Sequence, residues 1–167
     1  MKFHFLNRIL LVTLLPIAQQ SAAQTTISIP ATLTGDVIDL TLQHGTMNFF
    51  PGTATQTIGY NGAHLGPTLI LQKGQQVTTH WHGLHVAAMN DGSPHTPIMA
   101  DETWSPSFTV LDNAATYWYH PHLHGKTLKQ VVKGAAGLII VRDAEEAALN
   151  LPRTYGVDDV PLIFQWQ

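Results

Sequence analysis

The chain has 167 residues, and its 8 basic side chains are outnumbered by 11 acidic ones. The formal net charge of −3 argues against nucleic acid as a partner, because proteins bind it through basic patches. The sequence contains 10 histidines and no cysteine, which excludes disulfides and thiolate ligands. A chain of this length is expected to form one domain with its own core.

Residues 1–23 have the order of charged, apolar and small side chains typical of a secretory signal peptide. Lys2 and Arg8 accompany the apolar run Ile9–Ala18, and Ser21-Ala22-Ala23 supplies the small residues that precede a cleavage point. The apolar run is too short for a membrane anchor, since a span takes about 20 residues. We therefore expect cleavage after Ala23 and a periplasmic or secreted product.

The rest of the sequence predicts short strands separated by glycine and proline. Val37–Gln43 alternates apolar and polar residues, as a half-buried strand does. Further β-prone runs are Thr68–Leu71, the segment around Val77, Ser107–Leu111, Thr116–His120 and Gly137–Val141. Ala144–Leu149 alone has a helical composition. Many short strands at fairly even spacing favour a β-sandwich or a small barrel.

Two tight groups of histidines are the main chemical signal of the sequence. His80 and His82 flank Trp81, and His120 and His122 flank Pro121. In extended backbone, residues two apart project to the same face, so each pair presents two imidazoles side by side. Neutral imidazole binds zinc, copper, iron and nickel, and among these copper(II) binds nitrogen most tightly. The pattern therefore predicts a metal site and favours copper, while zinc stays open.

The other histidines carry a weaker signal. His85 and His124 follow the two pairs closely, and we expect them to support the ligands or to be exposed. His44, His64 and His95 stand alone and are interpreted as ordinary structural or surface residues.

The motifs around the paired histidines resemble those of the multicopper oxidases, which include laccases, bilirubin oxidases and periplasmic bacterial cuprous oxidases. The most specific matches are His80-Trp81-His82-Gly83 and, downstream, Trp118-Tyr119-His120-Pro121-His122. Other matching segments are Gly59–Gly62, Leu65–Leu69, Asp91-Gly92, Leu123–Thr127, Gly134–Ile139 and Tyr155–Ile163. The resemblance covers nearly all of the chain after the signal peptide.

This resemblance implies a cupredoxin-like (plastocyanin-like) Greek-key β-sandwich or barrel over residues 24–152, followed in 153–167 by a linker and the start of a second domain. It also implies half of a trinuclear copper cluster, with His80 as a type 2 ligand and His82, His120 and His122 as type 3 ligands. In the family the other histidines and the type 1 copper come from the last domain. The implied partners are thus the C-terminal cupredoxin domains, dioxygen and a small reducing substrate, with no nucleic acid and no membrane span after cleavage.

The sequence departs from the family pattern in two respects. Without cysteine it cannot build a type 1 copper site, and it has no further His-x-His motif to close the cluster, so we expect the isolated chain to lack oxidase activity. Family members also have a β-run between the Gly74 turn and the His-Trp-His-Gly motif. Here Val77-Thr78-Thr79 leads straight into His80, which predicts one strand fewer beside the metal site.

Other interpretations stay open. The chain would also suit a stand-alone periplasmic copper-binding or copper-buffering protein, an assembly in which several copies combine their histidine pairs, or a remnant that folds poorly. The β-prone run Asp158–Phe164 fits the first strand of a second domain and an edge strand of this one equally well.

Overall fold

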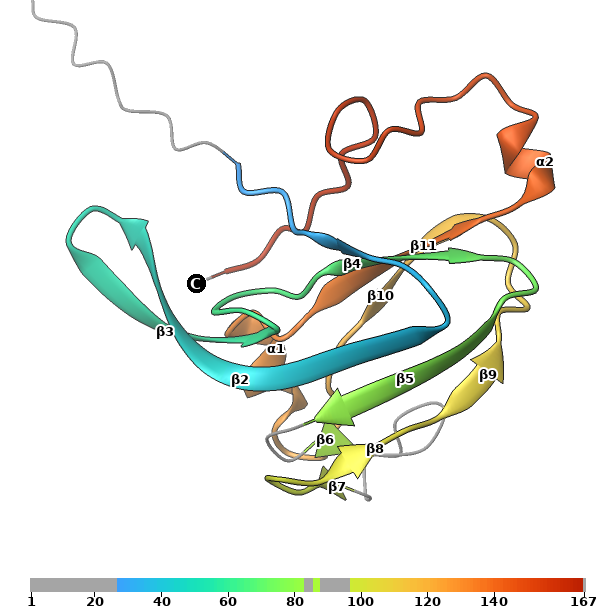
Figure 1. Ribbon diagram of the computed structural model, residues 1–167. Coiled ribbons are helices and arrows are strands. Elements are labelled where there is room, and N and C mark those ends of the chain that lie inside the picture. The colour runs from blue at the N-terminus through green and yellow to red at the C-terminus, as the bar shows by residue number, and fades with distance from the viewer. Residues whose placement is uncertain (1–26, 83–85, 88–96, 167) are drawn as a thin grey trace, which may run out of the picture.

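The computed structural model describes residues 27–82, 86–87 and 97–166, and in these ranges the chain forms mainly strands (Figure 1). The predicted signal peptide lies outside the described residues, as do His85, His95 and the Asp91-Gly92 motif. In chain order the elements are β1 (Thr32–Leu33), β2 (Val37–Phe50), β3 (Thr53–Tyr60), β4 (Thr68–Gln72), β5 (Gln76–His82), β6 (Val86–Ala87), β7 (Pro97–Ile98), β8 (Thr103–Trp104), β9 (Ser107–Thr109), β10 (Ala115–Tyr119), α1 (Thr127–Val132), β11 (Gly137–Arg142) and α2 (Ala144–Ala147).

Two sheets enclose the core. The first histidine pair lies on β5 of one sheet, and the second pair follows the end of β10 of the other. One sheet has the order β1-β4-β11-β10, and the other has the order β3-β2-β5-β8, with β9 also paired to β5. β6 and β7 form a separate two-stranded sheet. The β2–β3 hairpin curves away from the body of the domain (Figure 1). The predicted all-β sandwich is confirmed, with open sheets instead of a closed barrel.

The core forms where alternating apolar residues of the two sheets meet. Ile38, Leu40 and Leu42 of β2 are at most 3% exposed, while the residues between them are exposed, as the period-two pattern predicted. The opposite sheet contributes buried Leu69, Leu71 and Val141. This packing of two inner faces holds both histidine motifs on a common scaffold.

The other predicted elements correspond to β4, β5, β9, β10, β11 and α2, whereas the longer elements β3 and α1 and the two-residue strands β1, β6, β7 and β8 were not predicted. β3 has the sequence TATQTIGY, in which threonine and glycine hide any apolar alternation. α1 has no side-chain cap at Lys126, so no start signal appears in the sequence. α2 is capped by the Asp143 side chain, which accepts from the backbone N–H of Glu146. Neither described helix is long and apolar enough to cross a membrane.

β5 places His80 inside a sheet. Its backbone pairs with β2 in parallel and with β8 and β9 in antiparallel fashion, so the strand has neighbours on both sides. His80 lies in register with Asp39, and His82 with both Thr41 and Thr103. The short segment after Gly74 thus forms one continuous strand through the motif. That relatives carry one strand more at this point stays a prediction.

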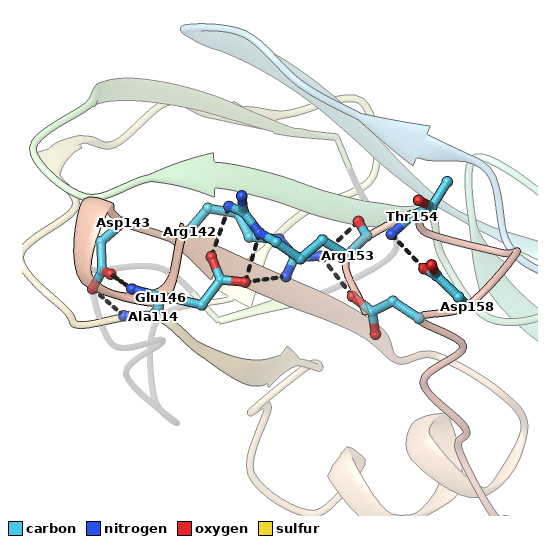
Figure 2. A network of polar contacts seen from close by, with 8 residues as sticks. Ala114, Arg142, Asp143, Glu146, Arg153, Thr154 and Asp158 are labelled. Atoms are coloured by element: carbon cyan, nitrogen blue, oxygen red, sulfur yellow. Dashed lines mark hydrogen bonds and ion pairs between the residues drawn. The ribbon is translucent and has the colours of Figure 1, made fainter. Parts of the chain in front are cut away.

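The C-terminal segment folds back along the domain through a polar network around Arg142 (Figure 2). The Arg142 guanidinium donates to Glu146 and Asp159, and Arg153 donates to both carboxylate oxygens of Glu146 at 2.8 and 2.7 Å. Farther along, Gln165 Nε2 donates to the carbonyl of Val131 at 2.9 Å. Residues 160–166 form no strand, so in the described chain the run from Asp158 does not return as an edge strand.

Candidate metal centre

Three aromatic rings, of which Tyr60 and Tyr119 are buried and Trp81 is half-buried, connect β5 with the end of β10. Trp81 of β5 contacts Tyr119 of β10 with ring centroids 5.7 Å apart, and Tyr60 of β3 contacts Tyr119 at 5.2 Å and Trp81 at 5.7 Å. All three pairs are edge-to-face, the arrangement that aromatic rings favour. Trp81 lies between His80 and His82, and Tyr119 immediately precedes His120. The aromatic triad of Tyr60, Trp81 and Tyr119 therefore brings the two motifs together across the sandwich.

The same triad determines which face of β5 carries His80. Successive side chains of a strand point to opposite faces, so inward-facing Trp81 places His80 on the outer face. There the imidazole is half-buried, and its Nδ1 lies 2.7 Å from the Ser105 hydroxyl, on the connection between β8 and β9. This bond fixes the ring orientation and leaves Nε2 as the nitrogen not held by Ser105. Such an outer partner on one ring nitrogen is typical of metal-binding histidines.

His120 and His122 form a stacked pair beyond the end of β10. Their ring centroids are 4.3 Å apart with the planes inclined by 29°, and Trp118 covers His120 at 4.0 Å. The His120 Nδ1 lies 3.1 Å from the Pro121 carbonyl. A carbonyl oxygen only accepts, so Nδ1 carries the hydrogen and the lone pair is on Nε2.

Burial lowers the pKa of His120 below its ordinary value, and the neighbouring His122 lowers it further. The Pro121 carbonyl acts in the opposite direction, but the net shift is downward. At neutral pH the His120 ring is therefore neutral, which is the form that binds metals.

The four predicted ligands are only partly described. His82 ends β5, and its side chain lies outside the described part, so the structure characterises the side chains of His80, His120 and His122. In the described ranges no three or more histidine and carboxylate side chains gather closely enough to hold a metal ion. The donors that are present are imidazoles, which fit copper, but the described side chains do not form a closed site.

The remaining histidines behave differently from one another. His124 and His44 are exposed. His64 is half-buried and packs edge-on against Phe49 with centroids 5.1 Å apart, and its burial lowers its pKa. Sequence reasoning missed the roles of Ser105 and Tyr60. A lone serine in a loop has no spacing signal, and Tyr60 was noted only as part of a matching segment.

Comparison with known proteins identifies the family. The family model described as "Multicopper oxidase" matches residues 41–146, which include all four predicted ligands. A multicopper oxidase of Staphylococcus aureus is 40% identical over 138 residues, covering 75% of this chain and 30% of that protein. The cell division protein FtsP of Escherichia coli K12 is 34% identical over 143 residues, covering 78% of this chain and 30% of that protein.

Solved structures agree with this assignment. The bacterial laccase-like multicopper oxidase CueO from Ochrobactrum sp. superposes with a TM-score of 0.75 at 36% identity, covering 81% of this chain and 34% of that one. The McoA multicopper oxidase of Aquifex aeolicus gives 0.72 at 31% identity, covering 84% and 35%. The chain thus spans about a third of the length of the relatives it matches. The predicted cupredoxin-like sandwich is confirmed, and the chain belongs to the multicopper oxidase family.

Proposed function

We propose that this chain is the N-terminal domain of a multicopper oxidase and supplies half of a trinuclear copper cluster. His80 is assigned to the type 2 position, and His82, His120 and His122 to the type 3 positions. The ring contact between Trp81 and Tyr119 is the observation that supports the proposal, because it joins the middle residue of the first His-x-His motif to the residue that precedes the second.

The residues of this chain would hold and orient the metal. Ser105 and the Pro121 carbonyl occupy one nitrogen each on His80 and His120, so the opposite nitrogen is the donor in each ring. The lowered pKa of His120 keeps that ring ready to bind without first losing a proton. Copper held by these histidines would supply the chemistry of dioxygen reduction to water, with electrons reaching it through the type 1 copper of the C-terminal domain. Without cysteine for a type 1 site, the isolated chain is expected to show no oxidase turnover.

A copper titration of the purified chain tests this assignment. The chain is titrated by calorimetry and by electron paramagnetic resonance, alongside the variants His80→Ala and His120→Ala. His44→Ala is the matched control, since it removes an exposed histidine outside both motifs. We expect stoichiometric binding that weakens by at least tenfold in both motif variants and is unchanged in the control, because each removes one direct ligand. Urea unfolding of the same samples shows whether each variant is folded.

Two outcomes would contradict the proposal. Binding that is equally strong in all variants would place copper elsewhere, and a folded chain that binds no copper would leave the motifs without a metal function. This second outcome matters because one group of relatives is named for cell division, a name that says nothing about copper.

The expected export is a separate part of the proposal. The chain is expected to be periplasmic or secreted, with residues 1–23 removed. N-terminal sequencing of the protein recovered from the periplasm or medium checks this, and a start at Gln24 is the expected result.

A further inference from the structure

Trp118 is a large apolar side chain on the surface, and its ring contacts one of the proposed copper ligands. It is 55% exposed, whereas Tyr119, the next residue, is buried in the core. The indole lies against the imidazole of His120, with ring centroids 4.0 Å apart and the planes inclined by 35°. Because Trp118 lies outside the hydrophobic core, core packing does not account for an indole at this position.

Strand pairing anchors Trp118 but not His120. Trp118 pairs in register with Leu138 of β11, so the sheet holds its backbone. β10 ends at Tyr119, and His120 is the first residue beyond the strand. Side chains two residues apart in extended backbone share a face, which places the indole beside the imidazole. Trp118 is therefore the last residue of β10 on this face, and it supports a histidine that the sheet itself does not hold.

The orientation of the His120 ring matters for a metal, because the lone pair on Nε2 lies in the plane of the ring. The last torsion of a histidine side chain has broad preferences, so the rotamer alone does not fix that plane. The bond from Nδ1 to the Pro121 carbonyl holds one edge of the ring. The ring contacts with Trp118 and His122, at 4.0 and 4.3 Å, restrict the rotation of the plane.

A ring that is already held in place binds a metal at a lower entropic cost. Immobilising one mobile side chain on binding weakens affinity by about two- to tenfold. An indole stacked on His120 removes part of this loss in advance, although it offers no donor atom to the metal. Indole suits this role, since it is broad, flat and rigid, with only two side-chain torsions.

We propose that Trp118 is a positioning residue for copper, which holds the imidazole of His120 in the orientation that binds the metal. This inference rests on the proposed function, in which His120 is a copper ligand. Trp118 acts through His120, so its contribution to copper affinity is expected to disappear when His120 is removed.

The test is a double-mutant cycle on copper affinity. Purified chains with Trp118→Ala, Trp118→Phe, His120→Ala and the combined Trp118→Ala and His120→Ala changes are titrated with copper(II) by calorimetry. Trp118→Ala is expected to weaken binding about three- to tenfold. Trp118→Phe is expected to restore most of the affinity, because a phenyl ring still stacks on the imidazole. In the His120→Ala background, Trp118→Ala is expected to change the affinity less than about twofold.

Electron paramagnetic resonance separates positioning from stability. A less ordered His120 ring gives bound copper(II) several geometries, so the hyperfine lines of Trp118→Ala are expected to be broader than those of the wild-type chain. Tyr117→Ala is the matched control, since it removes a neighbouring ring that is 38% exposed and bonds to the Asn113 carbonyl. It is expected to keep the copper affinity within about twofold and the line widths unchanged. Urea unfolding shows that each variant is folded.

The outcomes that overturn the inference differ from the one that overturns the proposed function. Unchanged affinity and line widths in a folded Trp118→Ala chain would show that Trp118 does not position His120. An equal loss in Tyr117→Ala, or a loss that persists without His120, would show a general effect of the strand surface. In these cases the wild-type chain still binds copper and the proposed function stands. A wild-type chain that binds no copper would refute the proposed function, and the positioning role with it.

Discussion

The buried hydroxyl of Tyr119 offers the sharpest test of how the domain holds its histidine motifs. Tyr119 is 7% exposed, and its hydroxyl donates to the Pro67 carbonyl at 2.7 Å, connecting β10 to the start of β4. Packing around it is close, since a Cβ on Gly66 or Gly137 would lie 2.3 Å from this hydroxyl. Burial raises the pKa of Tyr119, so the hydroxyl keeps its proton at any physiological pH. The hydrogen bond is therefore present whenever the domain is folded.

Tyr119→Phe removes this one bond and keeps the ring. A neutral hydrogen bond contributes about 1 kcal/mol net, and a buried acceptor left without its donor costs about 1 to 3 kcal/mol. We therefore expect the free energy of unfolding to fall by about 1 to 2 kcal/mol, measured by urea unfolding. Tryptophan fluorescence is a direct probe, because Trp81 contacts the substituted ring.

Tyr117→Phe is the matched control on the same strand. Its side chain is 38% exposed, and its hydroxyl bonds to the Asn113 carbonyl at a longer 3.3 Å. Surface changes of this kind usually stay within about 0.5 kcal/mol. Equal losses in the two variants would refute the reasoning, because they would show that the buried bond contributes no more than an exposed one.

Three further predictions concern packing, pH and the C-terminal segment. Gly137→Ala places a Cβ 2.3 Å from the Tyr119 ring and should lower the free energy of unfolding, measured in urea, by about 1 to 3 kcal/mol. Gly62→Ala adds a Cβ whose nearest atom is at 3.9 Å, so it should lower this free energy much less. Equal losses in the two variants would contradict the packing argument. Burial lowers the pKa of His64 and His120 below the ordinary 6.5, so the unfolded chain binds more protons than the folded chain as these groups titrate. The free energy of unfolding of the metal-free chain should therefore fall as the pH is lowered from 7 to 5. His64→Phe should flatten this pH dependence, and an unchanged slope would exclude His64 as a contributor. Asp159→Asn weakens the bond from Arg142, so it should speed hydrogen exchange in residues 153–166 but not in β11. The control Asp112→Asn removes an exposed carboxylate outside the network and should leave the exchange rates of both segments unchanged.

The sequence predicted the fold where apolar residues alternate. β2 shows this most clearly, since Ile38, Leu40 and Leu42 lie in the core as expected. The sequence did not predict elements in which the apolar alternation is interrupted or whose structure depends on tertiary contacts. β3 is rich in threonine, and α1 lacks a capping side chain. The backbone N–H of Ile58 in β3 donates to the Lys133 carbonyl just after α1. Neither element has a strong local signal, so each depends on tertiary packing.

In the candidate site, too, some residues could be predicted from their spacing and others only from the packed structure. Spacing alone singled out His80, His82, His120 and His122, because two His-x-His pairs occur in one small domain. Spacing did not reveal Ser105, which bonds to His80 from a segment 25 positions along the chain. Nor did it show that Trp81 and Tyr119 touch, since contacts between distant strands are settled only when the two sheets pack.

The outward position of His80, on the face opposite the inward-facing and half-buried Trp81, separates the residues that fold the domain from the proposed copper ligand. Leu40, Trp81 and Tyr119 can stay unchanged while the residues between and after them vary. A descendant could therefore exchange its histidines for other side chains with little loss of stability, and a family with this scaffold is free to acquire members that handle no metal at all. The same separation makes the histidines good targets for engineering, since new donors can be introduced there without repacking the interior.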